Sequence, residues 1–135
     1  MTAPDPETPT PTDEAGRVRE AARDVLAERE RQKAVEGWTP EHDDKHKAGD
    51  IACAAATYAL LACASLYPIE RARDDIRAGA REWWPWRRVW LKSTDPRRDL
   101  VKAGALILAE IERLDRAALA APEPAGPAAD GEDGA

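Results

Sequence analysis

The sequence predicts an all-α fold, a small bundle of three long helices with a tryptophan-rich loop. Three observations predict it. Apolar residues recur at helical spacing over three long segments, and helix caps and stop signals bound these segments. Apart from residues 88–91, no stretch shows convincing strand alternation. Charged residues make up 34% of the chain, mean hydropathy is −0.62, and no apolar run approaches the roughly 20 residues of a membrane helix. We therefore expect one helical domain over residues 14–120 and no association with a membrane.

The first long helix is predicted over residues 14–36, and Gly37 follows its last turn as a C-cap residue. Thr39 and Pro40 are typical of a helix start and predict a short turn over residues 40–47. On the first helix Val18, Ala22, Val25 and Arg29 recur at helical spacing, and Ala21 and Leu26 widen this stripe.

The second long helix is predicted over residues 50–66, after an interruption at Gly49. Its residues 51–63 are apolar on nearly every face, which is typical of a helix that is buried all round or lies in the middle of an oligomer. We therefore expect a homo-oligomer built through this Ala-rich helix. A short polar helix is predicted over residues 69–78, ending at Gly79.

The last helix is predicted over residues 96–120, with Asp95 as its cap and Pro96 in its first turn. The preceding residues 81–94 have no helical period and predict a loop. The glycine within the last helix marks a close contact with a neighbouring helix. The apolar stripe of this helix comprises Leu100, Gly104, Ile107, Ile111, Leu114 and Ala118.

Both ends of the chain are acidic and rich in proline. Residues 1–14 and residues 121–135 each carry four acidic side chains and no basic one, so the net charge of −6 becomes +2 for residues 15–120. Such tails cannot bury enough apolar surface to offset the entropy of ordering, and we expect disorder over residues 1–13 and 121–135. The first residues show no secretory signal pattern, and we expect a cytoplasmic protein.

Both histidines of the chain, His42 and His46, lie in one segment and are four residues apart. On a helix they point to one side, and Asp50 would extend that side if the helix continued through Gly49. Two imidazoles and a carboxylate can hold a divalent metal ion; the alternatives are a structural hydrogen-bond cluster and direct contact with a ligand. We expect the histidines to lie with Asp43 and Asp44 at the mouth of a pocket.

A second segment holds four tryptophans within eight residues, interleaved with basic side chains. Trp offers a stacking surface and Arg or Lys donates hydrogen bonds to phosphate, so the segment favours binding of a nucleotide or a short single strand. The alternative is that tryptophans cover the core of a protein without Phe, which we expect for two of the four. No helix has a dedicated basic face, which argues against binding of duplex DNA. The segment contains Trp83, Trp84, Trp86, Arg87, Arg88, Trp90 and Lys92.

Three stretches carry a family resemblance: Glu36-Gly37-Trp38-Thr39-Pro40-Glu41-His42-Asp43-Asp44-Lys45-His46, Trp83-Trp84-Pro85-Trp86, and the stretch from Arg97 to Ile107. Together they resemble a family of small helical proteins of phages and prophages, over about residues 24–117. The order of the helices is also distantly similar to that of the all-α MazG-like nucleotide pyrophosphohydrolases, which bind Mg²⁺ through carboxylates on two helices.

The similarity to MazG-like enzymes implies a nucleotide pocket without their metal site. Ala and Cys follow Asp50 where those enzymes have carboxylates, and Lys102 replaces an acid on the last helix. An ammonium group at that position repels Mg²⁺, which prefers several oxygen ligands. The resemblance then implies that Arg97, Arg98 and Lys102, near the N-terminus of the last helix, neutralise the phosphates of the ligand.

The sequence therefore predicts a phage-type protein that captures a nucleotide-derived ligand without cleaving it and so sequesters a host immune signal; no cofactor is expected. The first alternative is a divergent metal-dependent nucleotide hydrolase that uses His42, His46 and Asp50 as metal ligands. The second alternative is a protein-interaction module without a small ligand. The expected ligand-binding residues are Trp38, His42, Asp43, His46, Trp83, Trp84, Trp86, Arg87, Arg88, Trp90, Lys92, Arg97, Arg98 and Lys102.

Overall fold

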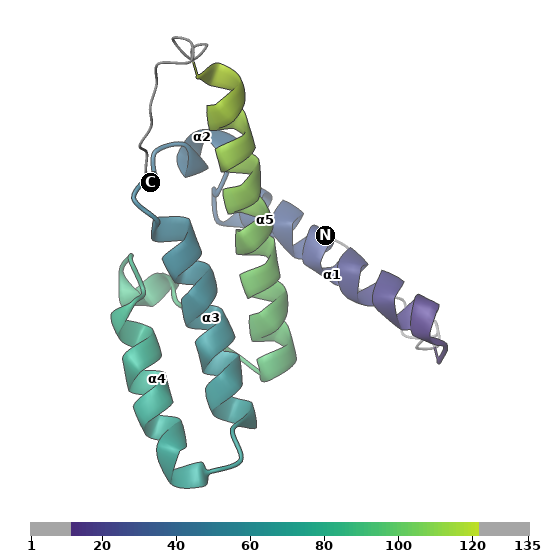
Figure 1. Cartoon of the computed structure of the whole chain (residues 1–135), viewed down its shortest axis with the longest axis vertical. Coiled ribbons are helices and arrows are strands. Elements are labelled where there is room, and N and C mark those ends of the chain that lie inside the picture. Colours follow the sequence, from purple (N-terminus) through teal and green to yellow (C-terminus); the bar gives the residue numbers. More distant parts are fainter. Residues whose placement is uncertain (1–11, 122–135) are drawn as a thin grey trace, which may run out of the picture.

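A computed structural model describes residues 12–121, and the expected disordered tails lie almost wholly outside this range. Between residues 12 and 121 the chain forms helices and no strand, so the predicted all-α class is confirmed (Figure 1). Within this range, no helix is both long and apolar enough to cross a bilayer. The helices are α1 (Glu14–Val35), α2 (Pro40–Asp43), α3 (Asp50–Leu66), α4 (Arg73–Glu82) and α5 (Pro96–Ala120), with 3₁₀ turns at Glu70–Ala72 and Arg88–Trp90.

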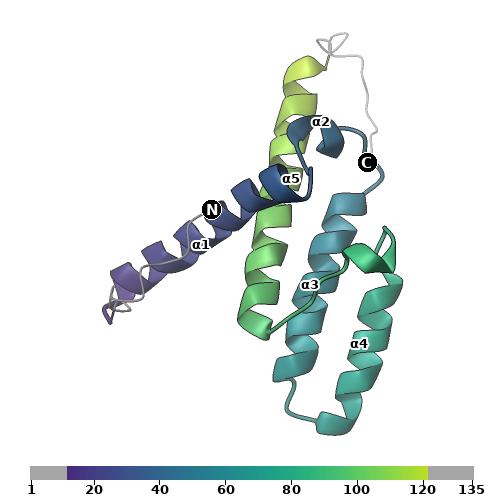
Figure 2. The same cartoon turned by 180° about the vertical axis from the view of Figure 1, so that it is seen from behind.

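Three of the helices pack side by side, and α1 crosses one of them, α5. α3 lies between α4 and α5 and contacts both (Figures 1 and 2). α1 packs with its C-terminal half on α5, while its N-terminal half extends away from the other helices in both views. The three long helices therefore lie where the sequence predicts them, but α1 is an oblique arm across α5 and not a parallel member of a bundle.

The helix boundaries follow from short side chains that cap exposed N–H groups. The Gly16 N–H donates to the Asp13 carboxylate at 2.7 Å, and the Arg98 N–H donates to the Asp95 carboxylate at 2.9 Å. Gly37 and Gly49 have φ values of 76° and 85°, a left-handed conformation that glycine adopts without steric cost. These two glycines bound the segment that carries both histidines.

The core is built from α3, α5 and aromatic side chains of the connecting segments. Small residues on α3 and α5 let the two backbones approach closely, so the core face of α5 carries alanines. The apolar stripe that the sequence indicates on α5 is therefore not its core face, because its large members are about half-exposed. The core cluster contains Trp38, Ile51, Ala54, Ala55, Tyr58, Trp84, Ala103, Leu106 and Ala109.

Two glycines inside helices behave differently from each other. The prediction that a helix ends at Gly79 is wrong, because α4 continues through it to Glu82. Packing outweighs the helix-breaking tendency of glycine there, since Ala80 is buried and its carbonyl oxygen lies 3.3 Å from the Thr57 hydroxyl. Gly104 does mark a close contact, because a Cβ there would lie 3.2 Å from a methyl carbon of Val25.

Candidate functional site

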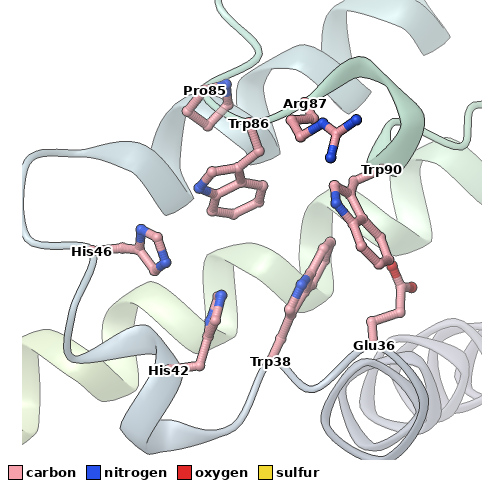
Figure 3. A pocket seen from close by; sticks show the side chains of 8 residues that line it. All are labelled: Glu36, Trp38, His42, His46, Pro85, Trp86, Arg87 and Trp90. Carbon is pink, nitrogen blue, oxygen red and sulfur yellow. The ribbon is translucent and has the colours of Figure 1, made fainter.

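A pocket with a volume of about 660 Å³ opens between the segment after α1 and the segment after α4. The two segments are about forty residues apart in the sequence. The first carries the histidine motif and the second carries the tryptophan motif. Figure 3 shows the side chains of both segments turned toward the same space. The lining residues are Glu36, Trp38, His42, His46, Pro85, Trp86, Arg87 and Trp90.

Trp38 is placed by the way the chain leaves α1. The positive φ of Gly37 turns the chain back, and the Trp38 N–H donates to the Gln32 carbonyl at 3.0 Å. The Trp38 carbonyl in turn accepts a 2.9 Å hydrogen bond from the Arg29 guanidinium. Trp38 is buried as a result, and its ring forms part of both the core and the pocket.

The two imidazole rings lie side by side, with centroids 4.5 Å apart. The Nδ1 atom of His42 is 3.2 Å from a carboxylate oxygen of Asp43, and that of His46 is 2.9 Å from Asp50. A neutral imidazole that donates its Nδ1 proton to a carboxylate has an acceptor at Nε2. The arrangement therefore leaves two Nε2 atoms for a ligand, with both rings held in orientation from behind.

The acidic neighbours of the histidines do not line the pocket. Asp43 is buried beneath it and forms a 2.8 Å ion pair with Arg29. Asp44 lies at the surface and pairs with Arg116 at 2.9 Å. Among residues 12–121, no three His, Cys, Asp or Glu side chains gather as a metal site requires.

The opposite wall is an irregular segment anchored on core aromatics. The Trp84 indole N–H donates to the Arg87 carbonyl at 3.0 Å, and the Lys92 N–H donates to the Tyr58 hydroxyl at 3.1 Å. Trp84 and Tyr58 are both buried, so residues 84–92 are fixed to the core at two points. Two of the four tryptophans of this segment, Trp86 and Trp90, line the pocket.

Trp86 is the centre of the aromatic contacts in the pocket. Its ring centroid lies 5.4 Å from Trp38, 5.4 Å from His46 and 5.3 Å from Trp84. Its Nε1 atom is buried and has no hydrogen-bond partner among residues 12–121. A buried donor without a partner costs free energy in the folded state.

The charges in the pocket are mixed. Arg87 is the cation among the lining residues, and Lys92 lies near the rim with its ammonium group 5.5 Å from the Trp90 ring centroid. Glu36 is the anion, and its carboxylate is paired with the guanidinium of Arg31. The pocket thus combines aromatic surface with one directed positive charge.

No family model, curated protein or solved structure matches this chain.

The other predicted cations do not line this pocket. Arg97 pairs with Asp24 at 2.8 Å, and Arg98 pairs with Glu28. Lys102 is buried and donates to the Lys92 carbonyl, and burial together with the charge of Arg98 lowers its pKa. Arg97 and Arg98 therefore join α5 to α1, and Lys102 anchors the irregular segment that precedes α5.

Of the fourteen predicted ligand-binding residues, the pocket brings together six, and it adds two that the sequence analysis missed. Trp84 is in the core, whereas Trp83 and Arg88 are exposed outside the pocket. The missed residues are Glu36, two positions before the motif residue Trp38, and Pro85, which directly precedes Trp86. Their signal was this adjacency, since a wall built from a short segment includes neighbouring positions.

Proposed function

We propose that the protein captures a nucleotide-derived small molecule in this pocket without cleaving it. The observation that carries the proposal is the convergence of three tryptophans, two oriented imidazoles and one arginine on one cavity of about 660 Å³. Pockets for small molecules are typically about 300–1,000 Å³, mostly apolar, with a few directed polar groups. Capture without cleavage is also what the sequestering of a signal molecule requires.

The chemistry of the lining favours a planar base with a single phosphate. A base can stack on Trp38 or Trp90, because every base has a π-face. The two imidazole Nε2 atoms can accept hydrogen bonds, so a base edge that carries donors fits. Arg87 can bind one phosphate, whereas Arg97, Arg98 and Lys102 are engaged elsewhere. We therefore assign to the pocket a nucleoside monophosphate or a cyclic monophosphate, and not a polyphosphate.

A hydrolytic function is the second candidate, and the paired histidines favour it. Each imidazole is backed by a carboxylate, as in the acid–base pairs that move protons in catalysis. Cleavage would leave a product different from the ligand added, whereas capture returns the same ligand. Recovery of the bound molecule from the complex therefore separates the two functions.

Calorimetry with nucleosides and their mono-, cyclic mono- and triphosphates tests the proposal. We expect a monophosphate to bind at least about tenfold more tightly than its nucleoside, because a charge-assisted hydrogen bond contributes about 1.5–3 kcal/mol. The triphosphate should bind no more tightly than the monophosphate. Chromatography of the ligand released by heating should return it unmodified.

Two pairs of variants make the test specific to the pocket. Arg87→Ala should remove the advantage of the monophosphate, and Trp90→Ala should weaken all the ligands by at least about tenfold, since stacking contributes about 1–3 kcal/mol. Arg88→Ala and Trp83→Ala are the matched controls, because both side chains are exposed outside the pocket. Absence of binding by every ligand, or equal effects of the control variants, would refute the capture function.

A homo-oligomer remains part of the proposed function. α3 is apolar on nearly every face, and it buries two of its sides against α4 and α5. Other helices of the same chain carry larger exposed apolar side chains.

A further inference from the structure

A row of large apolar side chains on α5 is left without a partner. The four residues are spaced seven, four and three positions apart, so they share one face of the helix. Each is about half-exposed, at 48–52%. Monomeric proteins rarely expose contiguous apolar patches larger than a few hundred Å². These residues, called the α5 stripe below, are Leu100, Ile107, Ile111 and Leu114.

The face of α1 that packs on α5 also continues beyond its contact. Val25 packs on Gly104, and Arg29 reaches Glu112 at 3.2 Å, so this face of α1 meets α5 over the C-terminal half of α1. One turn and two turns before Val25, the same face carries Ala22 and Val18, and Val18 is 62% exposed. Leu26, beside this face, is 58% exposed.

The N-terminal half of α1 has little tertiary packing. Residues 14–23 extend beyond α5 in both views, and Gly16 is the single buried residue among them (Figures 1 and 2). In proteins most of the stability of a helix comes from tertiary packing of its apolar face, and these residues have almost none. An apolar cover on this arm would supply the missing stabilisation.

We propose that a second copy of the chain supplies the cover, with the α1 arm of each copy lying on the α5 stripe of the other. In a two-fold dimer the same pair of surfaces meets twice, so both bare surfaces are covered by one arrangement. Both surfaces are apolar. Each one lies next to the residues through which α1 and α5 contact each other within one chain. The arrangement concerns residues outside the pocket and stands independently of the ligand proposed for it.

Size and charge both fit a second copy. The six exposed side chains Val18, Leu26, Leu100, Ile107, Ile111 and Leu114 present on the order of several hundred Å² per copy, close to the roughly 800 Å² that each partner buries in a standard interface. Residues 14–23 carry three Arg and two Glu, whereas residues 100–114, which hold the whole stripe, carry two basic and two acidic side chains. The arm is thus slightly basic and the stripe-bearing part of α5 is neutral, so net charge does not oppose their contact.

This interface differs from the one expected from the sequence. The exposed face of α3 presents small residues such as Ala52 and Ala56, and its largest exposed members are Leu60 and Leu66 at its end. A surface of alanines buries less apolar area per residue than the stripe of Leu and Ile on α5. The larger gain from burial therefore lies with α1 and α5.

Light scattering of the full chain, at protein concentrations from about 5 to about 200 µM, tests the proposal, because a dimer depends on concentration. We expect a mass of twice 14.8 kDa at the high end. Ile111→Glu on the stripe and Val18→Glu on the arm should each raise the dimer dissociation constant at least tenfold. Both positions are about half-exposed or more, so neither substitution should disturb the packed helices. Circular dichroism should show that the monomer retains its helix content, except in the arm.

Ala56→Glu on the exposed face of α3 is the matched control and should leave the dissociation constant unchanged. A wild-type mass of 14.8 kDa at every concentration overturns the proposal. Dissociation by Ala56→Glu, with no effect of Ile111→Glu, would move the interface to α3 and also overturn it. Dissociation by Ile111→Glu but not by Val18→Glu would show stripes packed on each other, and would overturn the role of the arm.

Discussion

The guanidinium of Arg29 donates a 2.8 Å hydrogen bond to the carboxylate of Asp43, and the two side chains are only 4% and 2% exposed. The same guanidinium donates to the Trp38 carbonyl at 2.9 Å and to Glu112 at 3.2 Å. One side chain of α1 therefore connects the start of the pocket wall, the helix α2 beneath the histidines, and α5. The position of Asp43 also sets the orientation of the His42 ring.

Removal of Arg29 should cost far more stability than removal of a surface partner. Arg29→Met leaves the Asp43 carboxylate buried without its counter-charge, and we expect a loss of about 3–5 kcal/mol in the free energy of unfolding. Arg116→Ala, which removes the exposed partner of Asp44, should cost less than about 1 kcal/mol. Urea denaturation measures both. Adding Asp43→Asn to Arg29→Met should recover part of the loss, and a loss from Arg29→Met no larger than that of Arg116→Ala would contradict the importance of the buried pair.

Two glycine substitutions should change stability in opposite directions. Gly79→Ala should raise the free energy of unfolding by up to about 1 kcal/mol, because alanine favours helix and nothing lies within 4 Å of the new Cβ. Gly104→Ala should lower it by about 1 kcal/mol, since overpacking against Val25 at 3.2 Å outweighs the same gain in helix propensity. The thermal midpoint reports both changes. In a Val25→Ala background the penalty at Gly104 should shrink, and an unchanged penalty would show that the contact is not its cause.

Acid should weaken the protein through Glu28. Burial raises the pKa of this carboxyl, but the hydrogen bonds from Arg31 and the charges of Arg31 and Arg98 outweigh it, and the pKa lies below its usual 4.5. A carboxyl with a lowered pKa in the folded state stabilises the fold above its unfolded pKa, and this contribution is lost as the pH falls through the folded value. The stability advantage of the wild type over Glu28→Gln should therefore shrink as the pH falls below about 4.5. Urea midpoints at neutral pH and in acid measure it, with Glu41→Gln at the surface as the control.

Base should weaken the protein through Tyr58. Burial raises the pKa of this phenol to about 12, although the hydrogen bond from the Lys92 N–H lowers it. A raised folded pKa gives stability that is complete below the unfolded pKa of about 10 and is lost as the pH rises toward the folded value. Tyr58→Phe loses a hydrogen bond of about 0.5–1.5 kcal/mol at neutral pH. The wild type should be the more stable protein near neutral pH and the less stable one by about pH 11. An advantage of the wild type that stays constant with pH would contradict the burial of the phenol.

The sequence predicts the helices well because their signals are local. Asp13, Thr39 and Asp95 each accept a hydrogen bond from the first turn that follows, as capping residues do. Packing is not local, and the predictions fail where packing decides. Gly79 stays inside α4 because Ala80 is buried, and the stripe on α5 faces outward because alanines on the next face fit more closely against α3.

The candidate site follows the same division. The tryptophan and histidine motifs are recognisable in the sequence by their side-chain chemistry, but their meeting in one pocket depends on the fold. The contacts of Arg97 and Arg98 with Asp24 and Glu28 join residues seventy or more positions apart. No local pattern indicates that these cations are already neutralised by α1.

The anchoring of the irregular pocket wall to Trp84 and Tyr58 has a consequence for amide exchange with deuterated solvent. Loops without regular hydrogen bonding usually exchange quickly, because their N–H groups open with small local fluctuations. Here the Lys92 N–H donates to the hydroxyl of Tyr58 on α3, and the indole N–H of the buried Trp84 donates to the Arg87 carbonyl of the wall. Their exchange should be slower than that of N–H groups of the same segment that have no such bond, since each bond ties the segment to a buried ring. A ligand therefore enters through the existing mouth without displacing that wall.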